Sequence, residues 1–198
     1  MIKNIIVDMG NVLLEYNPKK ILDAICTTQE CKDIIYKELF QGEEWILGDR
    51  GVILNHQRFD GASKRVPEKY HKELQACVDH WIDFMLPIPG AKDFCQWAKE
   101  QGYRLFVLSN ACGLFHTYFP KQFPLEWFEG VVVSADVKMI KPSAEIYEYV
   151  LQKFHLRPEE CLFIDDMEYN ITGAESVGIH GAVFKNDFCT IKNTLQTL

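Results

Sequence analysis

The chain has 198 residues, of which 47% are hydrophobic and 25% are charged, and its formal net charge is -7. This composition is typical of a globular protein with one core, or with a core domain that carries a smaller insert. The acidic balance and the lack of any basic run argue against a nucleic-acid-binding surface.

No run approaches the ~20 apolar residues of a membrane span, and the apolar run at the amino terminus is too short for a signal peptide. The seven cysteines are scattered and form no C-x-x-C pair. This pattern fits a reducing compartment and gives no thiolate metal site. We therefore expect a cytoplasmic protein that binds neither nucleic acid nor membrane, as a monomer or weak dimer.

The chain opens with a short apolar run that ends in a carboxylate. Ile5, Ile6 and Val7 are typical of a central strand in a parallel sheet. Asp8 ends the run, and Gly10 follows it with a backbone free to adopt unusual shapes. Ligands of open α/β sheets bind outside the carboxyl ends of the strands, so we expect Asp8 at that edge. Taken alone, such an aspartate more often caps a turn or a helix.

Residues 16–86 carry a helical pattern that begins with Asn17-Pro18, an N-cap followed by a first-turn proline. Apolar residues then recur at helical spacing, and no strand pattern interrupts them. We expect this segment to form an all-helical cap domain. The core domain would consist of residues 1–15 and 87–198.

From residue 87 onward, helices alternate with short apolar strands. The strands are expected at residues 105–108, 131–133, 161–164 and 182–184. Strands separated by helices predict an α/β fold, a Rossmann-like doubly wound parallel sheet with helices on both faces. The helical cap would be inserted after the first strand of this sheet.

Polar groups follow four of the predicted strands. They are Asp8, the pair Ser109-Asn110, the pair Lys141-Pro142 and the pair Asp165-Asp166. Each alone is better explained as a turn, a loop or a helix start. Together at one edge, the carboxylates would need a cation, and oxygen ligands suit Mg²⁺. A lysine with hydroxyl and amide donors would surround a phosphoryl group, and a carboxylate can be the nucleophile. The order therefore predicts a Mg²⁺-dependent phosphohydrolase.

The same residues resemble the haloacid dehalogenase superfamily, in its phosphatase-like branch with a helical cap, and are similar to glucose-1-phosphate phosphatase-like members. The motifs that match in order are Asp8–Leu13, Leu108–Asn110, Lys141–Pro142 and Phe163–Asp166. The resemblance implies a small phosphorylated metabolite, such as a sugar phosphate, and an aspartyl-phosphate intermediate. It also implies site roles: Asp8 as nucleophile and metal ligand, the Gly10 carbonyl, Asp165 and Asp166 as further Mg²⁺ ligands, Ser109 and Asn110 as phosphoryl-binding groups, and Lys141 as the cation that steadies the nucleophile.

One position departs from the family pattern. Family phosphatases usually carry a second aspartate, the general acid and base, where this chain has Gly10. Such catalysis is typically worth ~10²–10⁴ in rate. Our hypothesis is a preference for good leaving groups, as in glycosyl or acyl phosphates, with water, Glu44 or Asp49 replacing the missing acid. Segment 43–51 is the candidate for substrate selection, although Trp45 is better explained as core filler.

Three alternatives remain. A 2-haloacid dehalogenase shares the fold, but it usually has an aromatic residue at the Gly10 position and needs no Mg²⁺. A non-catalytic phosphate-ligand binding protein would account for the missing aspartate. A two-component receiver domain also uses carboxylates and a Lys-Pro pair, but its motif order differs and it has no helical insert.

Overall fold

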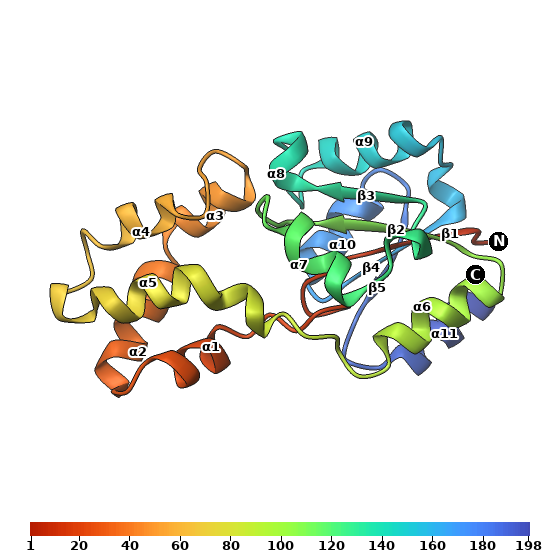
Figure 1. The fold of residues 1–198 in the computed structure, drawn as a ribbon. Coiled ribbons are helices and arrows are strands. Elements are labelled where there is room, and N and C mark those ends of the chain that lie inside the picture. Colours follow the sequence, from red (N-terminus) through yellow and green to blue (C-terminus); the bar gives the residue numbers. More distant parts are fainter.

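The computed structural model describes the whole chain, Met1–Leu198. Its centre is a five-stranded parallel sheet in the order β3-β2-β1-β4-β5. The strands are β1 (Asn4–Val7), β2 (Arg104–Ser109), β3 (Gly130–Val133), β4 (Cys161–Asp165) and β5 (His180–Val183). The predicted Rossmann-like doubly wound fold is confirmed (Figure 1).

Helices cover both faces of the sheet. On one face lie α6 (Ala91–Glu100), α7 (Phe115–Gln122) and α11 (Phe188–Thr197), and on the other lie α9 (Ala144–Phe154) and α10 (Glu168–Glu175). Successive strand residues point to opposite faces, so Ile5 and Val7 join the first hydrophobic cluster while Ile6 joins the second. The strand that carries the first motif is therefore buried on both sides.

The register of the sheet aligns the ends of its central strands. Val7 pairs with Val107 on one side and with Ile164 on the other. The Asp8 backbone N–H then donates to the Ile164 carbonyl at 2.8 Å. The residues that follow these strands consequently meet at one edge, where ligands of such sheets bind.

The last strand differs slightly from its predicted range. β5 begins at His180 and ends at Val183, whereas the apolar pattern predicted residues 182–184. It is an edge strand that pairs only with β4, and its side chains are half-buried or exposed. An edge strand of this kind needs no continuous apolar run, so the apolar pattern placed the start of β5 too late in the chain.

Between β1 and α6 all the regular elements are helices. Two isolated β-bridges, which pair Leu14 with Gly10 and with Pro87, are the exceptions. Its elements are α1 (Pro18–Ile25), α2 (Gln29–Ile35), η1 (Tyr36–Phe40), α3 (Glu43–Asp49), α4 (Gln57–Ala62), η2 (Glu68–Tyr70), α5 (His71–His80) and η3 (Trp81–Phe84). Figure 1 shows this helical lobe beyond the carboxyl edge of the sheet, with both termini at the far end. None of the helices is both long and apolar enough to cross a membrane.

Aromatic side chains fill the part of the helical lobe that faces the sheet. The Trp45 ring lies 5.2 Å from Trp81, 4.9 Å from Phe40 and 5.7 Å from Tyr16, measured between ring centroids. Trp45 is buried. It therefore belongs to the core of the lobe, as predicted, and it also forms part of a cavity wall at the sheet edge. On the sheet side, the short helix α8 (Ser134–Val137) follows β3 and packs near α3.

Candidate active site

Asp8 lies at the carboxyl end of β1 with its two carboxylate oxygens in different surroundings. Oδ1 accepts the Met9 backbone N–H at 2.7 Å and lies 2.9 Å from Lys141 Nζ. Oδ2 has no hydrogen-bond donor from the chain and is on the side of Gly10. Burial raises the pKa of Asp8 to about 7, although the nearby Lys141 opposes this shift. The free Oδ2 is thus the oxygen available to a ligand.

Lys141 joins two carboxylates beneath this edge of the sheet. Its Nζ lies 2.6 Å from Asp165 Oδ2 as well as 2.9 Å from Asp8, and it donates to the Leu108 carbonyl at 3.2 Å. The side chain is buried, with 1% of its surface exposed. Burial alone would lower the pKa of Lys141, but both carboxylates outweigh it and raise the pKa. Lys141 therefore carries a fixed positive charge beside Asp8.

Asp165 is fully buried and has no free oxygen. Oδ1 accepts the Met167 backbone N–H at 2.8 Å and the Asn170 amide at 3.0 Å. Oδ2 accepts from Lys141 and, at 3.1 Å, from Asn170. This side chain is consequently held by the first turn of α10 and by Lys141.

Asp166 is the more accessible of the acidic pair. Its Oδ2 accepts from the Asn11 amide at 3.2 Å. Burial and the adjacent Asp165 raise the pKa of Asp166. One carboxylate oxygen from each of Asp8, Asp165 and Asp166 lies within 4.8 Å of the others.

Carboxylates crowded in this way favour a bound cation, because a cation would relieve the repulsion that helps to raise the pKa values of Asp8 and Asp166. Oxygen donors of this kind suit Mg²⁺, which often binds through one or two carboxylates and shares its other positions with water and phosphate. The donor set of Asp8, Asp166 and, behind them, Asp165 therefore fits the predicted ion. Gly10 lies beside this set, because a Cβ atom placed on it would stand 4.0 Å from Asp8 Oδ2.

Ser109, the last residue of β2, and Asn110, which follows it, differ in what they bind. The Ser109 hydroxyl is buried and has no hydrogen-bond partner in the chain. Buried polar groups usually have a partner, and an unpaired one indicates a ligand or water. The Asn110 side chain is instead engaged with the Lys141 backbone, donating to its carbonyl at 3.0 Å and accepting its N–H at 2.8 Å. Asn110 therefore fixes the segment that carries Lys141.

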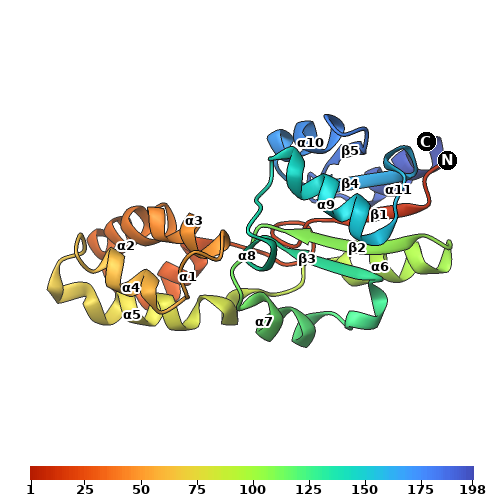
Figure 2. The same ribbon diagram turned by 90° about the horizontal axis from the view of Figure 1, so that it is seen from above.

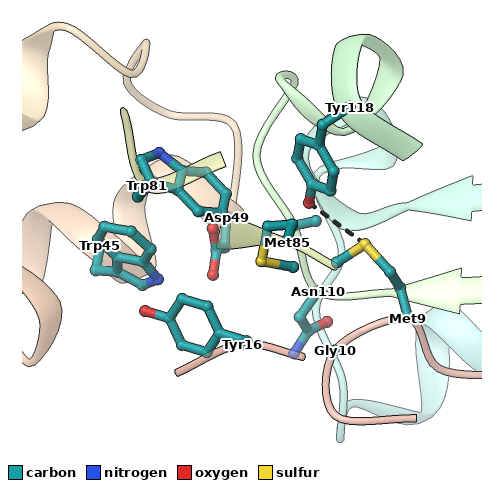
Figure 3. Close-up of a pocket in the computed structure, with 10 residues that line it drawn as sticks. Met9, Gly10, Tyr16, Trp45, Asp49, Trp81, Met85, Asn110 and Tyr118 are labelled. Carbon is teal, nitrogen blue, oxygen red and sulfur yellow. Dashed lines mark hydrogen bonds between the residues drawn. The ribbon is translucent and has the colours of Figure 1, made fainter. Parts of the chain in front are cut away.

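A cavity of about 80 Å³ opens between this edge and the helical lobe. Figure 3 shows Tyr16, Trp45 and Trp81 on one side of it and residues of the sheet edge on the other. The lining residues are Met9, Gly10, Tyr16, Trp45, Asp49, Trp81, Met85, Asn110, Ala111 and Tyr118. Most of the lining is apolar, and Asp49 is its only carboxylate.

Asp49 ends helix α3 and is held from two directions. Its carboxylate lies 3.0 Å from Nη2 of Arg58, a side chain with no exposed surface. The Arg58 guanidinium in turn lies 4.0 Å from the centroid of the Trp45 ring. The Asp49 backbone carbonyl accepts the Ser134 hydroxyl, whose oxygen also accepts the Ala111 backbone N–H at 3.0 Å. Ser134 thus links the lobe to the residue after Asn110.

Glu44, the other acid considered as a replacement at the Gly10 position, lies elsewhere. Its carboxylate accepts from Arg65 at 2.6 and 3.0 Å. The hydrogen bond from Arg65 lowers the pKa of Glu44. Glu44 does not line the cavity, so it belongs to an ion pair of the helical lobe.

The structure brings together all the predicted site residues: Asp8, Gly10, Ser109, Asn110, Lys141, Asp165 and Asp166. A parallel α/β sheet with clustered carboxylates, a buried lysine and an unpaired hydroxyl at its carboxyl edge defines a hydrolase of the kind that the motifs indicated. A family model described as haloacid dehalogenase-like hydrolase matches residues 2–178. The chain belongs to this family of enzymes.

Characterised relatives of the chain include phosphatases. It is 28% identical to the sesquiterpene phosphatase astK of Aspergillus oryzae, over 98% of this chain and 95% of that protein. It is also 28% identical to the pyrophosphatase PpaX of Bacillus cereus, over 89% of this chain and 80% of that protein.

Solved structures share the fold. A haloacid dehalogenase family enzyme of Bacteroides thetaiotaomicron, solved as a variant with magnesium and inorganic phosphate, superposes with a TM-score of 0.75 at 25% identity, over 96% of this chain and 99% of that one. The L-2-haloacid dehalogenase of Xanthobacter autotrophicus superposes with a TM-score of 0.65 at 16% identity, over 92% of this chain and 77% of that one. The latter likeness shows the fold alone.

Three polar residues of the site have no signal of their own in the sequence. Asn11 contacts Asp166, Asn170 contacts Asp165, and Arg58 contacts Asp49. Asn11 lies within the first motif that resembles the family, which is the one hint that could have marked it, whereas Asn170 lies after the fourth motif. Arg58 lies inside α4, where a charged residue normally indicates an exposed helix face.

Proposed function

We propose that this enzyme is a Mg²⁺-dependent phosphohydrolase that removes phosphate from a small phosphorylated metabolite through an aspartyl-phosphate on Asp8. The observation that carries the proposal is the position of Lys141 between two buried carboxylates, at the sheet edge where β2 ends in the unpaired Ser109 hydroxyl. This set can neutralise and hold a phosphoryl group while Asp8 attacks it. Its family membership and its phosphatase relatives support the same reaction class.

The hydrogen bonds indicate how Asp8 would act. Because Oδ1 is engaged by Met9 and Lys141, Oδ2 is the oxygen free to attack phosphorus. The Ser109 hydroxyl would donate to a phosphoryl oxygen, and Lys141 would offset the charge that develops around Asp8. Mg²⁺ would be held by Asp166, the Gly10 carbonyl and the Asp8 oxygen that does not attack, with Asp165 close by, and it would neutralise the remaining phosphoryl charge.

The cavity favours a compact apolar organic group on the phosphate. Its lining includes Tyr16, Trp45, Trp81 and Tyr118, and no cationic side chain. Aromatic and sulfur-containing walls gain free energy by burying apolar surface, and they offer sugar hydroxyls few hydrogen-bond partners. The Aspergillus oryzae relative is named as a sesquiterpene phosphatase, which is consistent with an apolar substrate. At about 80 Å³ the cavity accepts a small group, and a longer chain would require the helical lobe to open.

We also propose that residues 16–86 act as a cap domain over the core of residues 1–15 and 87–198. The helical lobe contributes Tyr16, Trp45, Asp49, Trp81 and Met85 to the cavity, and the sheet edge contributes Met9, Gly10, Asn110 and Ala111. The cap would therefore select the organic part of the substrate. A cap over the site would also exclude water from the reaction.

Phosphate release from a panel of substrates tests the proposal. The panel contains benzyl phosphate, glucose 1-phosphate, acetyl phosphate and p-nitrophenyl phosphate, each measured with Mg²⁺ and with EDTA. We expect Mg²⁺-dependent release, benzyl phosphate preferred to glucose 1-phosphate, and complete loss in Asp8→Asn. Asp93→Asn, a change at an exposed position on α6, is the matched control and should retain activity. Halide release from a 2-haloacid without metal would instead identify a dehalogenase, and ligand binding with no turnover would identify a binding protein.

A further inference from the structure

Gly10 leaves an open space beside the nucleophile. A Cβ atom placed on Gly10 would meet only Asp8 Oδ2, at 4.0 Å, and nothing nearer. The first motif therefore carries no carboxyl group at the position from which family phosphatases usually transfer the proton. A group that transfers protons there has to come from another part of the chain.

The cavity contains one carboxyl group that comes from outside the sheet edge. Asp49 lines the same cavity as Gly10 and Asn110 (Figure 3), and it comes from the helical lobe, the part of the chain proposed above to select the organic group. We propose that Asp49 is the general acid and base of this enzyme, replacing the proton-transfer group that is missing at Gly10. This inference rests on the phosphatase function proposed above.

The surroundings of Asp49 suit proton transfer. Arg58 is the positive group that faces it, and Tyr16, Tyr118 and Cys112 are the other titratable groups close enough to influence it or be influenced by it. Burial raises the pKa of Asp49 to about 6, although Arg58 opposes this shift. A carboxyl group with a pKa near neutrality can both give and accept a proton under working conditions.

The position of Asp49 is also fixed relative to the sheet edge. Arg58 holds its carboxylate, while Ser134 holds its backbone carbonyl and contacts Ala111, which follows Asn110. A positioned group is what general acid–base catalysis requires, because the proton has to be transferred over hydrogen-bond distance. Glu44, in contrast, is engaged by Arg65 away from the cavity.

The reaction then has two balanced steps. In the first, Asp8 Oδ2 forms a bond to phosphorus, the bond from phosphorus to the organic oxygen breaks, and the protonated Asp49 gives its proton to that oxygen. In the second, the Asp49 carboxylate takes a proton from water, whose oxygen attacks the aspartyl-phosphate. The bond between phosphorus and Asp8 breaks, which releases phosphate and restores the Asp8 carboxylate.

Asp49→Asn separates this role from a structural one, because asparagine keeps an oxygen that can accept from Arg58. Benzyl phosphate has a poor leaving group that needs the proton, and p-nitrophenyl phosphate has a good one that needs it much less. We expect kcat/KM for benzyl phosphate to fall by ~10²–10⁴ and kcat/KM for p-nitrophenyl phosphate to fall far less. A burst of p-nitrophenol should also precede the slow steady state, because the second step has lost its base.

Two further variants make the result decisive. Adding Gly10→Asp to Asp49→Asn should restore much of the benzyl phosphate activity, since the first motif has room for a side chain. Asp60→Asn, at an exposed position on α4, should leave the ratio of the two kcat/KM values unchanged. An equal fall for both substrates, with no burst and no rescue, would overturn the role of Asp49. Turnover that survives Asp8→Asn would instead overturn the proposed phosphatase mechanism itself.

Discussion

The ammonium of Lys141 lies 2.9 Å from Asp8 Oδ1, and both side chains are buried at the carboxyl edge of the sheet. The same ammonium also neutralises Asp165, so one positive charge serves two carboxylates. Burying charges is costly unless they are paired and hydrogen-bonded. The stability and the activity of the protein are therefore expected to depend on the same side chain.

Replacing Lys141 with methionine removes this charge while keeping most of the side-chain volume. Breaking a buried pair typically costs about 3–5 kcal/mol, and we expect a loss of that size in the free energy of unfolding, together with loss of phosphatase activity. Burial already raises the pKa of Asp8 to about 7, so the uncompensated carboxylates destabilise the fold most when they are ionised. The loss should consequently be larger at pH 8 than at pH 5.

Urea unfolding in EDTA at both pH values measures this effect without interference from metal ions. Lys121→Met, which changes an exposed lysine on α7, is the control and should alter neither stability nor activity. A loss of stability that is equal at pH 5 and pH 8 would contradict the assigned role of the ion pair.

Ser109→Ala should separate stability from function. The hydroxyl is buried without a partner, so its removal takes away an unfavourable desolvation and changes the free energy of unfolding by less than about 1 kcal/mol, in the stabilising direction. A hydrogen bond to a charged phosphoryl group would be lost, which is worth about 1.5–3 kcal/mol, or roughly 10- to 100-fold in kcat/KM. Thermal unfolding and steady-state kinetics measure the two effects. Unchanged kinetics would show that Ser109 does not bind the phosphoryl group.

Asn170→Ala should weaken the metal site without removing a ligand. Asn170 donates to both oxygens of Asp165, and groups that orient metal-binding residues typically contribute about 10–100-fold to affinity or activity. We expect the Mg²⁺ concentration for half-maximal activity to rise by a factor in that range. Asn193→Ala, at an exposed position on α11, is the matched control. An unchanged Mg²⁺ requirement would limit Asn170 to a role in folding.

Gly173→Ala should disturb the loop that carries Lys141. A Cβ atom on Gly173 would come within 2.5 Å of the Pro142 carbonyl oxygen, so α10 has to move away from this loop. We expect a loss of about 1–3 kcal/mol in stability, the usual cost of overpacking, and a fall in activity as Lys141 shifts. A Cβ atom on Gly113 would meet nothing within 4 Å. Gly113→Ala should therefore change the free energy of unfolding by less than about 0.5 kcal/mol. Urea unfolding measures the stability of the two variants, and hydrolysis of p-nitrophenyl phosphate measures their activity.

The strands and the residues that follow them could be predicted because each signal is local. β1, β2 and β4 are short apolar runs, and parallel pairing then brings Asp8, Ser109 and Asp165 to one edge without further information. The start of β5 could not be predicted in the same way, because an edge strand need not be apolar throughout. The local sequence pattern thus predicts the central strands better than the edge strand.

The supporting contacts depend on partners that are distant in the chain. Asn170 is an ordinary polar residue of α10 until the fold places it beside Asp165, and Asn110 would be expected to bind the ligand rather than the Lys141 backbone. Arg58 was not predictable at all, since its burial depends on the ring of Trp45 and on the carboxylate of Asp49. Such roles depend on tertiary packing, and no residue spacing in the sequence indicates them.

The hydroxyl of Ser134 contacts both the Asp49 carbonyl on the helical lobe and the Ala111 backbone on the sheet side. A lobe that swings away has to break this contact and takes Asp49 with it, whereas Asp8 and Lys141 stay on the sheet. An arriving substrate would then meet a nucleophile without its proton donor until the lobe has returned. The timing of the reaction would then be coupled to closure of the lobe through the hydroxyl oxygen of Ser134. Water that enters the open enzyme would find no Asp49 carboxylate to activate it.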